Sequence, residues 1–160
     1  MPRRALLLLS VALPLAALDL MHKLAAPTAD WAYHARGTTW IAMSGSVALG
    51  TLALARVPSA AVAATAGVFA AGAVGNGIAA VAWDRGIPNP FVVESGAAVI
   101  AFNLADLFTL TGIALLMVAL CSVTIRNREQ LLPPREFARM LSNRRKARTR
   151  GDGCSKREDP

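Results

Sequence analysis

The chain has 160 residues, of which 54% are hydrophobic and 17% are charged, and its formal net charge is +7. Residues 57–83 and 98–125 each form a long run with almost no charge, sufficient to cross a bilayer core of about 30 Å. A soluble domain would instead show amphipathic periodicity, with charges every few residues. The composition therefore excludes an ordinary soluble domain and predicts an all-α, polytopic membrane protein.

The first apolar segment predicts a span at about 5–21, which follows the basic residues Arg3 and Arg4. Asp19 lies near its end, and Lys23 follows four positions later. A short apolar stretch after a basic start also resembles a secretory signal peptide. Cleavage of that peptide would leave three spans, whereas a retained first span agrees with the distribution of charge along the rest of the chain.

Three further spans are expected, at about 39–55, 58–83 and 98–125. Of the 17 Lys and Arg residues, eleven lie after Ile125. Because positive charge collects in cytoplasmic loops, the N-terminus, the turn at Arg56 and the C-terminal region are expected inside the cell. The prediction is a four-transmembrane-helix bundle of residues 1–125 with both termini cytoplasmic, followed by a basic cytoplasmic tail of residues 126–160.

The basic tail has two interpretations. Residues 136–150 predict a short helix that lies on anionic lipid headgroups, or else the whole tail is disordered and only enforces the topology. Because the tail lacks the interleaved aromatic residues of an RNA-binding segment, we expect no nucleic acid partner. The oligomeric state does not follow from the sequence.

The cysteines and histidines do not predict a cofactor. Cys121 and Cys154 lie near the end of the fourth span and in the tail, so no structural disulfide is expected. His22 and His34 are isolated, and the chain contains no paired-cysteine or paired-histidine motif. We therefore expect neither a metal site nor another cofactor.

Polar residues within the apolar runs are the candidates for function. Asn76 lies eight residues before Asp84, at the end of the third span, and Asp106 lies eight residues into the fourth. At 1.5 Å per residue, both are expected at about 12 Å below the outer surface, and Asn103 shares a helix face with Asp106. Asp19 is expected to cap the same cluster. The cluster predicts either a hydrogen-bonded link between helices or a functional site.

Two sequence blocks carry a family resemblance. GAVGN at residues 72–76 and FNLAD at residues 102–106 resemble the signature blocks of the bacterial lipoprotein signal peptidases, also called signal peptidase II. Asn103 follows Asn76 by 27 positions, as in that family, and the order of the blocks and the four-span topology also agree. In the first span, Asp19 and Lys23 resemble the family's D-x-x-x-K pattern, so the resemblance extends over residues 5–125.

The resemblance implies an aspartic endopeptidase in the bacterial cytoplasmic membrane, which removes signal peptides from prolipoproteins and related lipidated substrates. Two carboxylates share this chemistry in the family: one activates a water, and the other polarises the scissile carbonyl. By position, Asp106 corresponds to the catalytic aspartate of the fourth span. Asn76, Asn103, Asp19 and Lys23 correspond to the polar residues that support it.

One position departs from the family pattern. The second catalytic aspartate is expected three residues after Asn76, where this chain has Ala79. Asp84 is a possible substitute acid if the third helix breaks near its end, and Glu94 and Asp19 are further candidates. The sequence therefore leaves two hypotheses: a divergent peptidase with a relocated acid, or a non-catalytic relative that binds lipid, lipopeptide or a membrane partner.

Overall fold

The computed structural model describes residues 2–130. Contacts between residues divide the chain into two compact units, with the boundary after Val123. The fold and the site described below belong to the first unit, and the short 3-10 helix η3 (Arg128–Gln130) belongs to the second. The helix predicted at residues 136–150, and most of the basic tail, lie outside the described residues.

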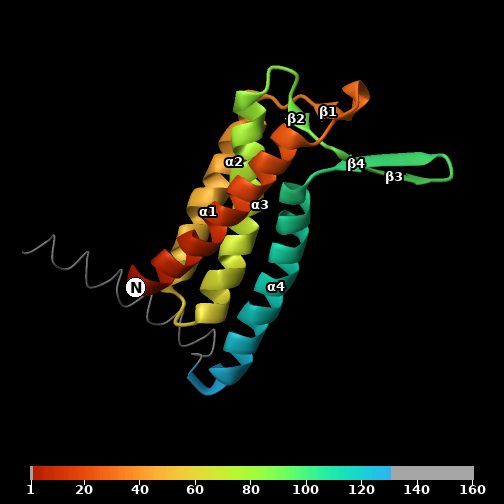
Figure 1. The fold of residues 1–160 in the computed structure, drawn as a ribbon. Coiled ribbons are helices and arrows are strands. Elements are labelled where there is room, and N and C mark those ends of the chain that lie inside the picture. The colour runs from red at the N-terminus through yellow and green to blue at the C-terminus, as the bar shows by residue number, and fades with distance from the viewer. Residues whose placement is uncertain (1, 131–160) are drawn as a thin grey trace, which may run out of the picture. The chain divides into compact units, whose positions relative to one another are not determined.

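Within the described part of the chain, four helices are long and apolar enough to cross a membrane (Figure 1). They are α1 (Pro2–Ala25), α2 (Thr38–Thr51) with its 3-10 continuation η2 (Leu52–Arg56), α3 (Ala60–Ala82) and α4 (Leu104–Arg126). Three of the predicted spans agree closely with these helices. The structure is mostly helical, as predicted, and the side of the membrane on which each terminus lies stays a prediction.

Helix α3 is the element against which the other helices pack. α1 lies along most of its length, and α2 packs on it as well. α4 also lies close to α3. The approach is so close that a side chain at Gly112 would collide with the backbone of Phe69. Small residues permit such close helix approach in a membrane protein, where dispersion contacts replace the hydrophobic effect. The bundle is therefore built around the alanine- and glycine-rich surface of α3.

The start of the fourth span was predicted wrongly. Residues 98–102 form a strand, β4 (Ala98–Phe102), which pairs with β3 (Phe91–Ser95) in an antiparallel hairpin, and α4 begins only at Leu104. Ser95 pairs with Ala98, and Gly96 has φ +60, as a two-residue turn that starts with glycine requires. Hydropathy does not separate a short apolar strand from the first turn of a helix, so the prediction extended the helix too far.

The bundle is not all-α in the strict sense. Besides the hairpin, β1 (Tyr33–His34) pairs with β2 (Ile87–Pro88) in a second two-stranded sheet. The β1–β2 sheet joins the α1–α2 connection to the α3–α4 connection, and Figure 1 shows the β3–β4 hairpin extending away from the helix ends. At its base, Phe91 stacks on His22 of α1 with ring centroids 4.7 Å apart. The hairpin therefore joins α4 to the end of α1 that carries the polar residues.

Candidate functional site

The first turn of α4 is closed by a reciprocal capping box formed by the FNLAD block. The Asn103 side chain accepts a hydrogen bond from the Asp106 backbone N–H at 3.1 Å, and the Asp106 carboxylate accepts one from the Asn103 N–H at 3.1 Å. Two backbone donors that a helix leaves without partners are thereby satisfied. Asp106 thus has a structural role that explains its spacing from Asn103.

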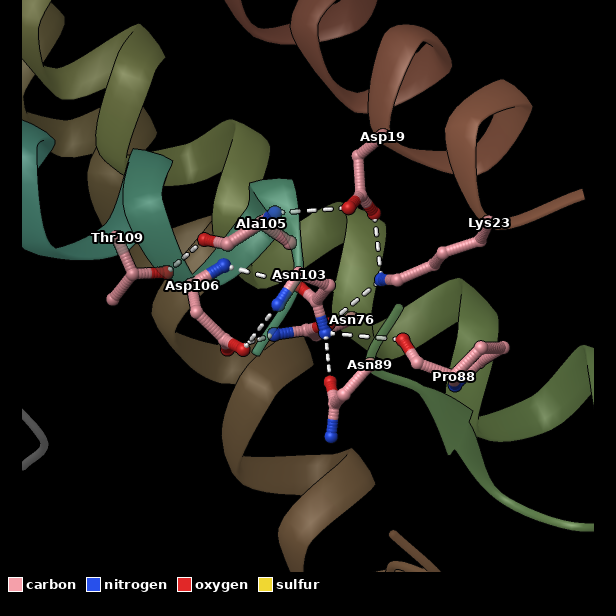
Figure 2. A network of polar contacts seen from close by, with 9 residues as sticks. All are labelled: Asp19, Lys23, Asn76, Pro88, Asn89, Asn103, Ala105, Asp106 and Thr109. Atoms are coloured by element: carbon pink, nitrogen blue, oxygen red, sulfur yellow. Dashed lines mark hydrogen bonds and ion pairs between the residues drawn. The ribbon is translucent and has the colours of Figure 1, made fainter. Parts of the chain in front are cut away.

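Helix α1 supplies a buried ion pair to the same helix terminus (Figure 2). Asp19 and Lys23 have side chains with no solvent exposure, and their charged atoms are 2.7 Å apart. The second oxygen of Asp19 accepts a hydrogen bond from the Ala105 N–H at 2.9 Å. A carboxylate at this position is favoured by the partial positive charge of the α4 N-terminus. Asp19 was expected to cap the polar cluster, and its observed contacts are with Lys23 and the Ala105 N–H.

Asn76 of α3 connects the lysine of the ion pair to Asp106. Its side-chain oxygen accepts a hydrogen bond from Lys23 at 2.8 Å, and its amide nitrogen donates one to Asp106 at 2.8 Å. These bonds confirm the prediction that Asn76, Asn103 and Asp106 lie at one level. The stated reason was partly wrong, because Asp106 lies in the first turn of its helix rather than eight residues inside it.

The glycines of the GAVGN block make room for this arrangement. A Cβ at Gly75 would lie 2.5 Å from the Asp19 carboxylate, and a Cβ at Gly72 would collide with Thr109 and with the backbone of Ala105. Each glycine therefore admits one neighbour: Gly75 the buried carboxylate of α1, and Gly72 the first turns of α4. The block thus places Asn76 between two helices that approach α3 closely.

A chain of amides continues from this cluster to the connections between the helices. The side-chain nitrogen of Asn103 donates to the Asn89 side-chain oxygen and to the Pro88 carbonyl. The Asn89 nitrogen in turn lies 2.9 Å from Nδ1 of His34. Because that amide nitrogen donates, Nδ1 accepts, and the neutral His34 ring carries its proton on Nε2. Asn89 and Asn103 are both buried.

Two cavities meet at Asn76 and Asp106. One, of about 320 Å³, lies between α2, α3 and α4 and is lined mainly by apolar side chains, including Met43, Val47, Phe69 and Ile113. The other, of about 230 Å³, is polar and is lined by His34, Arg36, Asn89 and Asn103 among others. Trp40, Asn76 and Asp106 line both cavities. The half-buried Asp106 therefore lies in the wall that the apolar and the polar cavity share.

The structure does not bring the proposed substitute acids to this junction. α3 continues through Gly77 to Ala82 without a break, so Asp84 lies in the following turn and is exposed. Glu94 is exposed on β3, and Asp19 is turned to Lys23 and Ala105. None of the three lines either cavity. Ala79 is fully buried and lines neither.

Several residues that line the cavities were not predicted from the sequence. His34 was treated as isolated, and Arg36, Trp40 and Asn89 were not singled out. The only sequence signal was Asn89, a polar residue between two prolines in the connection from α3 to α4. The other three follow the end of α1 in the chain, and only the β1–β2 pairing brings their segment beside that connection.

Comparison with known proteins returns no match, whether with family models, with curated proteins or with solved structures.

Proposed function

We propose that this chain is a non-hydrolytic membrane protein that binds acylated amphiphiles, lipids or lipopeptides, on a scaffold resembling the lipoprotein signal peptidases. The observation that carries the proposal is the position of Asp106, at the junction of an apolar cavity and a polar one, without a second carboxylate lining either. An amphiphile has one apolar and one polar part, and the two neighbouring cavities offer a space for each.

The contacts of Asp106 argue against peptide hydrolysis. An aspartic peptidase needs two carboxylates that share a proton across a bound water. In the described part of the chain, both oxygens of Asp106 accept from N–H groups, of Asn76 and Asn103, and neither faces another acid. Ala79 cannot supply the missing group. Asp106 therefore has the contacts of a carboxylate that holds two helices together and borders a binding space.

The apolar cavity suits an acyl chain. The apolar side chains that line it come from three helices, α2, α3 and α4. At about 320 Å³ it falls in the range of small-molecule pockets, which are mostly apolar with a few placed polar groups. An acyl chain there would bring its polar end to Asp106 and to the second cavity. An apolar cavity beside a polar one favours an amphiphile over a soluble metabolite.

The membrane setting is part of the proposal. We infer that the four helices cross the cytoplasmic membrane of a bacterium, with both termini inside and the polar cluster near the outer surface. The concentration of Lys and Arg after Ile125 supports this orientation. The basic tail would then face anionic lipid headgroups. The apolar cavity, between membrane-spanning helices, would be open to ligands that arrive from the bilayer.

Quenching of Trp40 fluorescence by brominated acyl chains tests the proposal. The background chain carries Trp31→Phe and Trp83→Phe, so that only the tryptophan lining both cavities reports. We expect saturable quenching by a diacyl lipid or a diacylated peptide, and its loss in Ala73→Phe, because Ala73 lines the apolar cavity. Val81→Phe, on the same helix at an exposed position, is the matched control. Unsaturable quenching that Ala73→Phe leaves unchanged would refute the proposal.

A further inference from the structure

We propose that the polar cavity recognises a zwitterionic aminophospholipid headgroup, with its ammonium on Asp106 and its phosphate toward Arg36. The inference rests on the proposed binding function and names the chemistry of the group bound. It is carried by the charges that line the polar cavity, which are of opposite sign.

The buried cluster contains two carboxylates and one lysine. Asp19 and Lys23 neutralise each other through an ion pair with no solvent exposure. Asp106 has only neutral donors on its oxygens, and it forms no ion pair with a Lys or Arg in residues 2–130. Lys23 interacts electrostatically with Asp106 as well as with Asp19, so one cation faces two carboxylates. The remaining negative charge favours a positively charged ligand, because a partly dry setting strengthens their attraction. A primary ammonium offers three N–H donors to such a group.

The polar cavity is also lined by a positive charge, that of Arg36. Arg36 is exposed, lies over the Trp40 ring at 5.2 Å from its centroid, and forms no ion pair with a described carboxylate. Its guanidinium therefore remains available to a phosphate, which it matches in geometry. The His34 ring also lines this cavity. A ligand with an anion and a cation separated by a short linker satisfies both charges.

The walls of the two cavities share residues that would contact both the headgroup and the acyl chain of a lipid. Asp106 and Trp40 line the apolar cavity as well as the polar one. A headgroup in the polar cavity would therefore keep an acyl chain within reach of Met43, Val47 and Phe69. An acidic lipid without an amine would satisfy Arg36 and leave Asp106 facing like charge. The two cavities therefore favour lipids with an ammonium group over acidic lipids that lack one.

The experiment compares short-chain phosphatidylethanolamine and phosphatidylglycerol, both with brominated chains, by quenching of Trp40 in the background that lacks the other two tryptophans. We expect phosphatidylethanolamine to bind roughly tenfold tighter, as one added hydrogen-bonded charge contact allows. Asp106→Asn should reduce this ratio to near one, whereas Asp84→Asn, an exposed carboxylate outside both cavities, should leave it unchanged. Because Asp106→Asn also alters the capping box, helix content is measured alongside.

Arg36→Gln provides a second variant, outside the hydrogen-bonded cluster. It should weaken both lipids by a similar factor, and Arg85→Gln should weaken neither. Equal affinity for the two lipids in the parent chain, or a ratio that survives Asp106→Asn, would overturn the inference while leaving amphiphile binding intact. Tighter binding of a diacylated peptide with a free amino terminus would overturn it too, by assigning the site to lipopeptides. Failure of every amphiphile to quench Trp40 would instead refute the underlying function.

Discussion

Helices α1, α3 and α4 are joined in two different ways at their two ends. At one end, buried apolar residues pack together, namely Leu8, Ala12, Val62, Ala66, Ala70, Leu116 and Ala119. At the other end, the same three helices are joined by charged and amide groups: Asp19, Lys23, Asn76, Asn103 and Asp106. The same helices therefore meet through non-directional contacts at one end and through directional bonds at the other.

The difference teaches where function is expected. Small apolar residues are sufficient to bring helices together in a membrane, as the first end shows. Buried charges are costly there, so the polar end needs a further reason for its chemistry. Both cavities are bordered by Asn76 and Asp106 of that end, and the apolar one extends from there to Phe69, which packs against the apolar cluster. The polar end therefore joins the helices and also borders both cavities, which are the binding space under the proposed function.

The largest effect is expected from Lys23→Met. It leaves Asp19 buried without a cation and removes the donor to Asn76, so the free energy of unfolding in mixed micelles should fall by about 3–5 kcal/mol. Arg85→Met is the control, since it breaks the exposed ion pair with Asp30 and should have no measurable effect. Equal losses of unfolding free energy from the two variants would show that burial of the Asp19–Lys23 ion pair does not matter for stability.

The apolar end is tested by Leu8→Ala. Leu8 is 1% exposed within the apolar cluster, and its truncation should lower the free energy of unfolding by about 2–4 kcal/mol. Leu6→Ala, at an exposed position two residues away, should change it little. Amphiphile binding by the folded Leu8→Ala variant should equal that of the parent chain. A selective loss of binding would contradict the division between the two ends.

Close approach at the polar end is tested by Gly72→Ala. The new methyl group would collide with Thr109 and with the Ala105 backbone, so α4 must shift, at a cost of about 1–3 kcal/mol in unfolding free energy. Gly45→Ala on α2, where a Cβ meets nothing within 4 Å, should be neutral or stabilising. Thermal unfolding of both variants measures the difference. A neutral Gly72→Ala would mean that α4 does not pack tightly there.

The smallest losses of unfolding free energy are expected from variants at the N-caps of α4 and α3. Asn103→Ala removes the side chain that accepts from Asp106 and donates to Asn89, and should cost about 2 kcal/mol. Ser59→Ala removes only the single hydrogen bond from Val62 and should cost about 1 kcal/mol. Hydrogen exchange of the first-turn amides measures each loss locally. A larger loss at Ser59 would reverse the comparison.

Much of this arrangement was predictable from the sequence. Long uncharged runs predicted the four helices, because their length and composition are set by what can cross a bilayer. The depth comparison placed Asn76 beside Asp106, and the motif spacing linked Asn103 to the same cluster. The count along α3 used the fixed rise of a helix, whereas the count along the fourth span placed Asp106 correctly although residues 98–102 form a strand.

The remainder depended on contacts between distant segments. The β4 strand was read as helix, since a short apolar run has no period that separates the two structures. The roles of Arg36, Trp40 and Asn89 arise where the α1–α2 connection meets the α3–α4 connection, a pairing that local pattern does not reveal. The glycines were seen as small residues, but their specific neighbours, Asp19 for Gly75 and Thr109 for Gly72, appear only in the packed structure.

The most direct test of the account measures binding and cleavage in one sample. A diacylated prolipoprotein peptide with a fluorophore on its signal segment is incubated with excess protein in micelles, and bound and cleaved peptide are separated by mass. The account predicts bound, intact peptide for the parent chain, and no cleavage in either the parent or Asp106→Asn. Cleavage by the parent chain that Asp106→Asn abolishes would contradict it, and would restore Asp106 to a catalytic role.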